Sequence, residues 1–333
     1  MPIVRIEDVR LIALVAYCIF LVLLLVIFYF LLRYKDKSGR LFRLILFFCA
    51  VPATLSLTVR DLGRFDLFLI VITLLSLTIL SLKRHIWLIP VLMITALFIH
   101  EGFLILCAPT IVAAIIFVYL WDKREKRILF TLVVSAISVA GAFFVLYKFG
   151  NPTLGYEEFS RFIQSRATFY ITDLSVQECY FGIKDHIGLA SSSLLDAGSL
   201  VNFFMALLIL SPAILILLNL WSHALKNCGA QRNACRLLIL ATLSGLVVLP
   251  IATDYGRWLS EIIFCNFFAI FFLVSRDIIK VEELAEYSGG SFPLLFVSIL
   301  LTYLLFGPLH DWNPYPYKDN IIYSALSIIS VLF

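Results

Sequence analysis

Two copies of one short motif place an acid, a glycine, an arginine and an aromatic ring together. The first copy runs from Asp61 to Phe65 and the second from Asp254 to Trp258, and both read D-x-G-R-aromatic. In one interpretation each copy begins a helix: the Asp caps N–H groups, the glycine permits the turn and the ring anchors at a membrane interface. The arginine stays unexplained, because a cation in the first turn opposes the helix dipole.

An arginine at a helix start favours an anion as its partner. Backbone N–H groups at two helix starts, together with guanidinium groups, would bind phosphate or diphosphate oxygens. We therefore predict a diphosphate-binding set made of Arg60, Arg64 and Arg257. Asp66 and Glu261 are expected to hold these arginines in place, since Glu261 follows Arg257 by four residues on the same helix face.

The adjacent pair His100 and Glu101 is a second candidate for chemistry. It follows the apolar run 86–99, which as a helix is about 20 Å long and shorter than a hydrocarbon core. Ionisable side chains below the membrane surface face protein or a water-filled cavity, where burial and charge shift pKa values. We predict Glu101 as a proton acceptor and His100 as a ligand of sugar or phosphate. Alternatively, Glu101 only pairs with an arginine.

The longest connection between apolar runs, residues 148–199, is the only one large enough to fold over a substrate. From Tyr156 to Phe169 the aromatic residues recur near helical spacing, which predicts an amphipathic helix at the interface. Its role is either a lid or carbohydrate binding, because rings stack on sugars while charged groups bond to hydroxyls. The candidate substrate-binding residues are Tyr156, Arg161, Arg166 and Trp258.

The composition shows which kind of protein must position these groups. The 333 residues are 62% hydrophobic and 14% charged, and the mean hydropathy is +1.01. Too few charged residues remain to cover a water-facing surface, so soluble enzyme folds are excluded. Nucleic-acid binding is excluded as well, because the basic residues form short clusters between apolar runs. We predict an all-α, polytopic transmembrane bundle with residues 1–333 in one integral membrane domain.

Apolar runs long enough to cross a bilayer recur along the whole chain. About eleven spans are predicted, at 11–32, 42–58, 66–82, 86–99, 103–121, 128–147, 200–221, 237–252, 258–275, 291–307 and 320–333. Short cytoplasmic loops collect Lys and Arg, and placing the basic connection after the first span inside puts most of the 26 basic residues inside. The N-terminus is then outside, and so is the loop 148–199.

Metal and cofactor chemistry lack support in the sequence. None of the seven cysteines has convincing metal-site spacing, and Cys228 and Cys235 are interpreted as ordinary reduced thiols. Walker, zincin and nucleophile-elbow motifs are missing. We therefore predict a site without metal or cofactor.

The many spans, the motif copies at 60–66 and 254–258, the pair 100–101 ahead of Gly102 and Pro109, and the large outer loop resemble one family. They are similar to bacterial oligosaccharide repeat-unit polymerases of the O-antigen and exopolysaccharide type. The resemblance implies transfer of a glycan from one undecaprenyl-diphosphate carrier to the sugar end of another, at the outer face of the inner membrane. The chain is short for the family, and longer members often have two large outer loops.

By this resemblance the three arginines grip the diphosphate leaving group. A carboxylate deprotonates the acceptor hydroxyl, with Glu101 the first candidate and Asp61 or Asp254 the next. The implied partners are an undecaprenyl-diphosphate-linked oligosaccharide, the lipid bilayer and a chain-length regulator, with no nucleic acid.

Two alternatives remain open. A lipid-linked glycosyltransferase of the GT-C kind usually carries an acidic motif after its first span, whereas here that connection is basic. A transporter or flippase for lipid-linked sugars should have charged residues along a path through the membrane, and the predicted span centres contain almost none.

Overall fold

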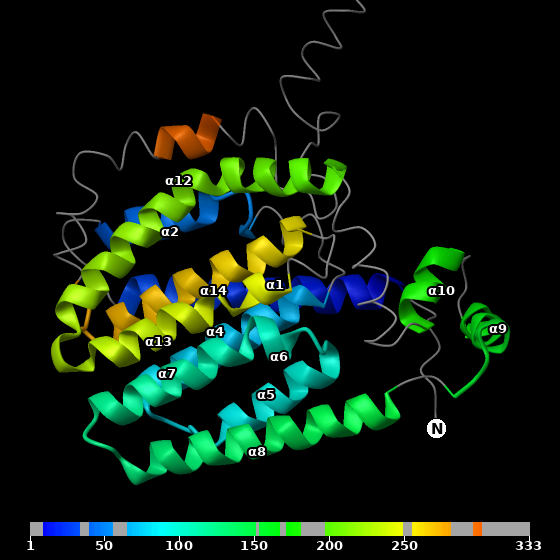
Figure 1. The fold of residues 1–333 in the computed structure, drawn as a ribbon, viewed down its shortest axis with the longest axis horizontal. Helices are drawn as coiled ribbons and strands as arrows, with labels where there is room; N and C mark the ends of the chain where they lie inside the picture. Colours follow the sequence, from blue (N-terminus) through cyan, green and yellow to red (C-terminus); the bar gives the residue numbers. More distant parts are fainter. Residues whose placement is uncertain are drawn as a thin grey trace, which may run out of the picture.

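The computed structural model describes residues 9–33, 40–55, 65–150, 153–166, 171–180, 197–248, 255–280 and 296–301. Across these residues the chain is helical and contains no β-strand (Figure 1), which confirms the all-α prediction. The longer elements are α1 (Val9–Arg33), α2 (Arg40–Ala50), α4 (Asp66–Leu82), α5 (Leu88–Ile99), α7 (Ala108–Trp121), α8 (Lys126–Phe149), α9 (Tyr156–Arg166), α10 (Asp173–Tyr180), α12 (Ala197–Asn227), α13 (Arg232–Thr242) and α14 (Tyr255–Ser275). The shorter ones are α6 (Phe103–Leu106), η1 (Gly229–Gln231) and η2 (Ser244–Val247).

Four helical segments in the described part of the chain are long and apolar enough to cross a membrane. They are Phe103–Trp121, Lys126–Phe149, Ala206–Asn227 and Gly256–Ser275. Shorter apolar helices, including Asp66–Leu82 and Leu88–Ile99, accompany them. Membrane character is therefore supported. The total of eleven spans and the orientation stay predictions, and the predicted span 320–333 lies outside the described residues.

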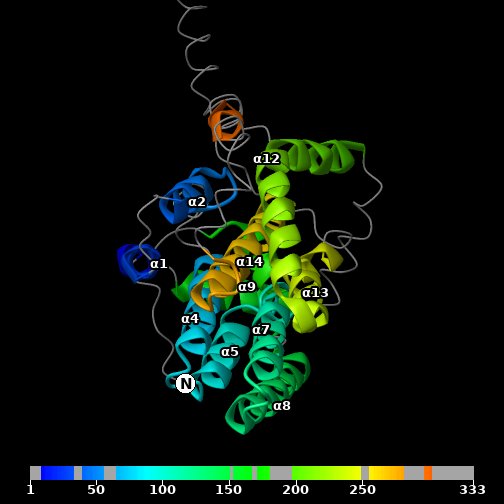
Figure 2. The same cartoon turned by 90° about the vertical axis from the view of Figure 1, so that its left-hand side faces the viewer.

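Helix α14 is the centre of the bundle. It lies between α12, α13, α7 and α4 when the molecule is viewed from its end (Figure 2), and 94% of its most apolar window is buried. A helix that is apolar on all sides is expected to be surrounded by protein or lipid. Here other helices cover it, so α14 is the element against which the rest of the structure is positioned.

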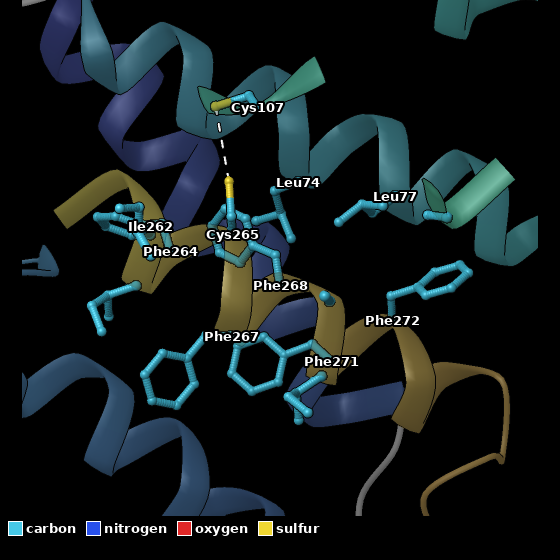
Figure 3. Packing of buried hydrophobic residues seen from close by; sticks show 14 of the residues in the cluster. Leu74, Leu77, Cys107, Ile262, Phe264, Cys265, Phe267, Phe268, Phe271 and Phe272 are labelled. Carbon is cyan, nitrogen blue, oxygen red and sulfur yellow. Dashed lines mark hydrogen bonds between the residues drawn. The ribbon is translucent and has the colours of Figure 1, made fainter. Parts of the chain in front are cut away.

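Aromatic side chains fill the contact between α14 and α2. The ring centroid of Phe48 lies 5.5 Å from that of Phe264, 5.0 Å from Phe267, 6.1 Å from Phe268 and 5.7 Å from Phe271. Three of the four pairs have edge-to-face geometry, which is worth about 0.5–1.5 kcal/mol per pair beyond the burial of area. Figure 3 shows these α14 rings on the same helix as Cys265.

One buried amide joins three helices. Asn266 of α14 accepts hydrogen bonds from Trp221 Nε1 of α12 at 2.8 Å and from Thr242 Oγ1 of α13 at 3.0 Å. Its Nδ2 donates to the carbonyl of Ile262 at 2.8 Å. The group is 4% exposed and hydrogen-bonded at both ends, which is the condition for burying an amide at low cost.

Charged residues at the ends of four helices form an ion-pair network. Arg276, after α14, places Nη2 2.6 and 2.7 Å from the two carboxylate oxygens of Asp122, which follows α7. Lys83, after α4, lies 2.9 Å from Asp122 and 3.5 Å from Glu125, which precedes α8. We call these four residues the Asp122 network. It fixes one end of α4, α7, α8 and α14 together.

The helices differ from the predicted spans in three places. The run 103–121 is interrupted at Cys107, because Pro109 follows and cannot donate within a continuous helix. Helix α2 stops at Ala50, ahead of Pro52, instead of continuing to residue 58. The run 237–252 begins within α13 but changes to the short helix η2. There Gly245 packs so closely that an added Cβ would lie 2.7 Å from Ile262.

Candidate functional site

The start of α14 meets the start of α4 at the end of the bundle opposite the Asp122 network. Arg257 Nε lies 3.3 Å from Asp66 Oδ2, and the side chains are 21% and 14% exposed. Asp66 is in the first turn of α4, where a carboxylate is also stabilised by the helix dipole. The predicted pairing of Asp66 with an arginine of the motif is therefore seen in the structure. The Asp66 carboxylate is an anion that offsets the unfavourable electrostatic position of Arg257 in the first turn of α14.

Trp258 connects the start of α14 to a third segment, the residues that follow α5. The guanidinium carbon of Arg257 lies 4.3 Å from the centre of the Trp258 ring, within cation–π distance. On another side the Trp258 ring meets His100 edge to face, with centroids 6.4 Å apart. The second motif copy and the His-Glu pair, about 150 residues apart in sequence, are thus neighbours. We call Asp66, His100, Glu101, Arg257 and Trp258 the Arg257 cluster.

The backbone after α5 fixes the imidazole of His100. The N–H of Gly102 donates a hydrogen bond to Nδ1 at 2.9 Å. A ring nitrogen that accepts a hydrogen bond carries no proton, so the proton of the neutral ring is on Nε2. The 3.8 Å approach of Glu101 Oε2 to Nδ1 is too long to compete with that bond. His100 is therefore set up to donate through Nε2.

Gly102 is required for this arrangement. A Cβ at position 102 would lie 3.0 Å from Nδ1 and 3.1 Å from Cε1 of His100, closer than side chains normally pack. Glycine therefore allows the ring to fold back over the backbone. The sequence showed Gly102 after the pair, but its steric role is visible only in three dimensions.

Two further acidic side chains near this end, those of Glu101 and Glu261, differ in exposure. Glu101 is half exposed, at 51% of its side-chain surface, whereas Glu261 is 1% exposed. Glu261 Oε2 accepts a hydrogen bond from the Cys107 thiol at 3.2 Å, and its Oε1 has no hydrogen-bond partner within the described part of the chain. The prediction placed Glu261 beside Arg257, four residues away. An electrostatic interaction between these two side chains is present, and the hydrogen bond of Glu261 in addition connects α14 to the break between α6 and α7.

Two cysteine pairs were not predicted. Cys107 and Cys265 lie with their sulfur atoms 4.0 Å apart in the core (Figure 3). Cys228 and Cys235, at the opposite end, are hydrogen-bonded to each other. That bond lowers the pKa of the Cys228 thiol and raises the pKa of the Cys235 thiol. The expectation of two ordinary thiols is thus refined to a coupled pair. No group of three or more metal-ligating side chains occurs among the residues that the structure describes.

The described residues of the predicted outer loop form a separate small unit. The predicted amphipathic helix is present as α9, and an additional helix, α10, packs against it through Tyr156 and Tyr180, whose ring centroids are 5.3 Å apart. Arg161 Nε donates to the carbonyl of Glu157, and Arg166 lies over the ring of Phe162 at 5.4 Å. Figure 1 places α9 and α10 beyond the end of the bundle, apart from the start of α14. The structure does not bring Tyr156, Arg161 or Arg166 to the Arg257 cluster.

Four of the predicted site residues lie outside the described residues. They are Arg60, Asp61, Arg64 and Asp254, so the first motif copy is represented in the structure by its last residue, Phe65, which Asp66 follows. The diphosphate-binding set and the two alternative carboxylates stay predictions.

Comparison with known proteins gave no match to any family model, curated protein or solved structure. The chemistry of the site is therefore argued from its own groups. The Arg257 cluster combines a cation on a helix start, an indole, an imidazole with a donor at Nε2 and an accessible carboxylate. Together these groups can bind an oxyanion, contact a sugar ring and accept a proton.

Proposed function

We propose that the protein transfers a glycan from a polyprenyl-diphosphate carrier to a sugar hydroxyl at the membrane surface, as an oligosaccharide repeat-unit polymerase does. The observation that carries the proposal is that the Trp258 ring contacts both Arg257 and His100, and that His100 has Glu101 beside it, although these residues come from separate parts of the chain. A cation and a carboxylate that share one site suit a reaction in which a phosphate group leaves while a hydroxyl is deprotonated.

In the proposed reaction the acceptor oxygen forms a bond to the anomeric carbon of the donor sugar. The bond between that carbon and the diphosphate oxygen breaks, and the electron pair leaves with the lipid diphosphate. The hydroxyl proton passes to the carboxylate of Glu101, which is the more exposed acid of this region. Arg257 stabilises the departing negative charge, and Asp66 orients the guanidinium group through Nε.

His100 would position the sugars, and Trp258 would position His100 and Arg257. The Nε2–H of His100 can donate to a hydroxyl or phosphate oxygen, since Nδ1 is engaged by Gly102. The buried Trp258 ring packs against the guanidinium group and against the imidazole, and so holds both at the site. In the predicted orientation the cluster faces the outer side of a bacterial inner membrane. The donor would then be the undecaprenyl-diphosphate-linked repeat unit named above.

Complementation of a strain lacking the gene tests the proposal. Glu101→Gln should lower the formation of long glycan chains by about 10²–10⁴-fold, the range for loss of a general base. Arg257→Ala should lower it by at least about tenfold through loss of charge stabilisation. Matched controls are Glu158→Gln on exposed α9 and Arg127→Ala at the opposite end of the bundle. Normal chain lengths in both test variants, at equal protein abundance, would refute the assigned roles.

The same cells distinguish transfer from transport of lipid-linked sugars. A transferase defect leaves single repeat units on the outer surface, because they still cross the membrane. A transport defect retains them inside. Surface labelling of single units in the Glu101→Gln strain therefore supports transfer, and their absence from the surface supports a flippase.

A further inference from the structure

Helix α14 carries one acidic residue inside its apolar stretch. From Trp258 to Ser275 the sequence contains a single acid, Glu261, and its side chain is 1% exposed. An acid within a candidate membrane span is costly, and it is by default a functional site whose partner should be named. One turn earlier on the same helix is Arg257, and the two side chains interact electrostatically. The charge state of Glu261 therefore depends on what else Arg257 serves.

Two carboxyl groups share the guanidinium group of Arg257. Asp66 Oδ2 lies 3.3 Å from Arg257 Nε, and both of these residues act electrostatically on Glu261. The two carboxyl groups repel each other when both are ionised, and one positive charge does not neutralise two negative ones. Where two carboxyl groups occupy one site, the pair keeps a proton that a single group would lose.

The surroundings of the two carboxyl groups decide which of them is charged. Asp66 is 14% exposed and lies in the first turn of α4, where the helix dipole favours an anion. Glu261 lies in the core, and the hydrogen bond that it accepts comes from the Cys107 thiol, a weak donor, at 3.2 Å. Its Oε1 has no hydrogen-bond partner among the described residues. A buried charge needs good donors around it, so the charge belongs on Asp66 and the proton on Glu261.

Thiols make up the rest of the environment of Glu261. Cys265 follows it by one turn on α14, and the sulfur atoms of Cys265 and Cys107 lie 4.0 Å apart (Figure 3). In the described part of the chain, no titratable group besides Asp66, Arg257 and these two cysteines acts on Glu261. Neither thiol supplies a positive charge. The shared guanidinium group and one weak thiol hydrogen bond are thus what favour the ionised form of Glu261.

We infer that Glu261 is a proton-binding site in the interior of the bundle, held as a neutral carboxylic acid at neutral pH while Asp66 carries the negative charge beside Arg257. The proton keeps a second negative charge away from the guanidinium group. Arg257 and Asp66 then form a pair without net charge, which repels an incoming anion less than a group with a net negative charge would. The inference concerns the protein at rest and does not depend on the proposed glycan transfer.

Infrared difference spectroscopy of the full-length protein, purified in detergent at neutral pH, is the first test. A protonated carboxyl group has a carbonyl band that is separate from the bands of a carboxylate. The difference between the wild type and Glu261→Gln should show the loss of one such acid band. Glu158→Gln, the same substitution on exposed α9, is the matched control and should remove carboxylate absorption instead. Loss of carboxylate absorption in Glu261→Gln, with no acid band lost, overturns the proposal.

A second variant connects the acid band to this place in the fold. Cys107→Ala removes the thiol that donates to Glu261 Oε2, so the band should move to higher frequency. Cys18→Ala, at an exposed cysteine of α1, is the control and should leave the band in place. If Glu261→Gln fails to fold, the cysteine variants still decide. A band that moves only in Cys107→Ala supports the proposal. A wild-type spectrum without an acid band, or a band that Cys107→Ala leaves unmoved, overturns it.

Discussion

Helix α14 has an arginine near each end, and the two are held in different ways. Arg276 brings one nitrogen to within 2.6 and 2.7 Å of both oxygens of Asp122, which Lys83 also contacts. Arg257 presents Nε to a single oxygen of Asp66 at 3.3 Å and lies over an indole ring. Short contacts to both oxygens characterise a fixed anchor. The contact of Arg257 with Asp66 is longer, and the same guanidinium group lies beside His100 and Glu101 through Trp258, so we assign stability to one end and propose chemistry at the other.

Removing the anchor should have the largest effect on folding. Arg276→Ala leaves the carboxylate of Asp122 with Lys83 alone in a site where both partners of the lost pair are about 15% exposed. We expect a loss of about 2–3 kcal/mol in the free energy of unfolding, below the full cost of breaking a fully buried pair. The thermal midpoint of the purified protein in detergent measures it. Arg236→Ala, an exposed arginine at the same end, is the control.

Separate substitution of Asp66 and Asp122 tests directly whether one end of α14 serves chemistry and the other end stability. Asp66→Asn removes the charge that orients Arg257 and should reduce glycan transfer about tenfold, while the thermal midpoint stays near that of the wild type. Asp122→Asn should do the reverse, with a lower midpoint and normal transfer per folded molecule. Equal loss of activity and stability in both variants would remove the distinction between the two ends.

A smaller effect is expected from one added methyl group. Gly102→Ala places a Cβ 3.0 Å from His100 Nδ1, so the ring must turn away from its rotamer. At about 0.5–1.5 kcal/mol for such a displacement, transfer should fall by roughly two- to tenfold. Gly141→Ala in α8 is the matched control, because nothing lies within 4 Å of its Cβ position. Activity unchanged by Gly102→Ala would show that the position of His100 is unimportant.

Hydropathy predicted much of the fold because long apolar helices have a simple signature. The predicted run 66–82 coincides with α4, and 86–99 differs from α5 by only two residues at its start. The break at Cys107 was missed because the average hydropathy of the run 103–121 is that of a continuous span. Helix α10 was missed because it is short and without strong apolar periodicity. Average hydropathy carries no record of such interruptions, although Pro109 marks the one at Cys107.

The site was predicted only in part, because the sequence does not show which helices pack against each other. Spacing within one helix predicted the charge interaction of Glu261 with Arg257, but it did not predict the hydrogen bond of Glu261 to Cys107, on another segment. The proximity of Asp66 to Arg257 was anticipated from their common place at helix starts. The contact between His100 and Trp258 depends on how three helices pack. Sequence thus indicated the chemical groups, and tertiary packing decided which of them meet.

The buried amide of Asn266 has a consequence for biosynthesis. The ribosome makes α12 first, so the Trp221 N–H enters the bilayer before its acceptor exists. Asp66 is synthesised earlier still, and its partner Arg257 is present only once α14 has been made. Until α14 emerges, these polar groups must find temporary partners in water, lipid headgroups or the insertion machinery. A nascent chain that stops before residue 255 therefore lacks the element that completes its interior.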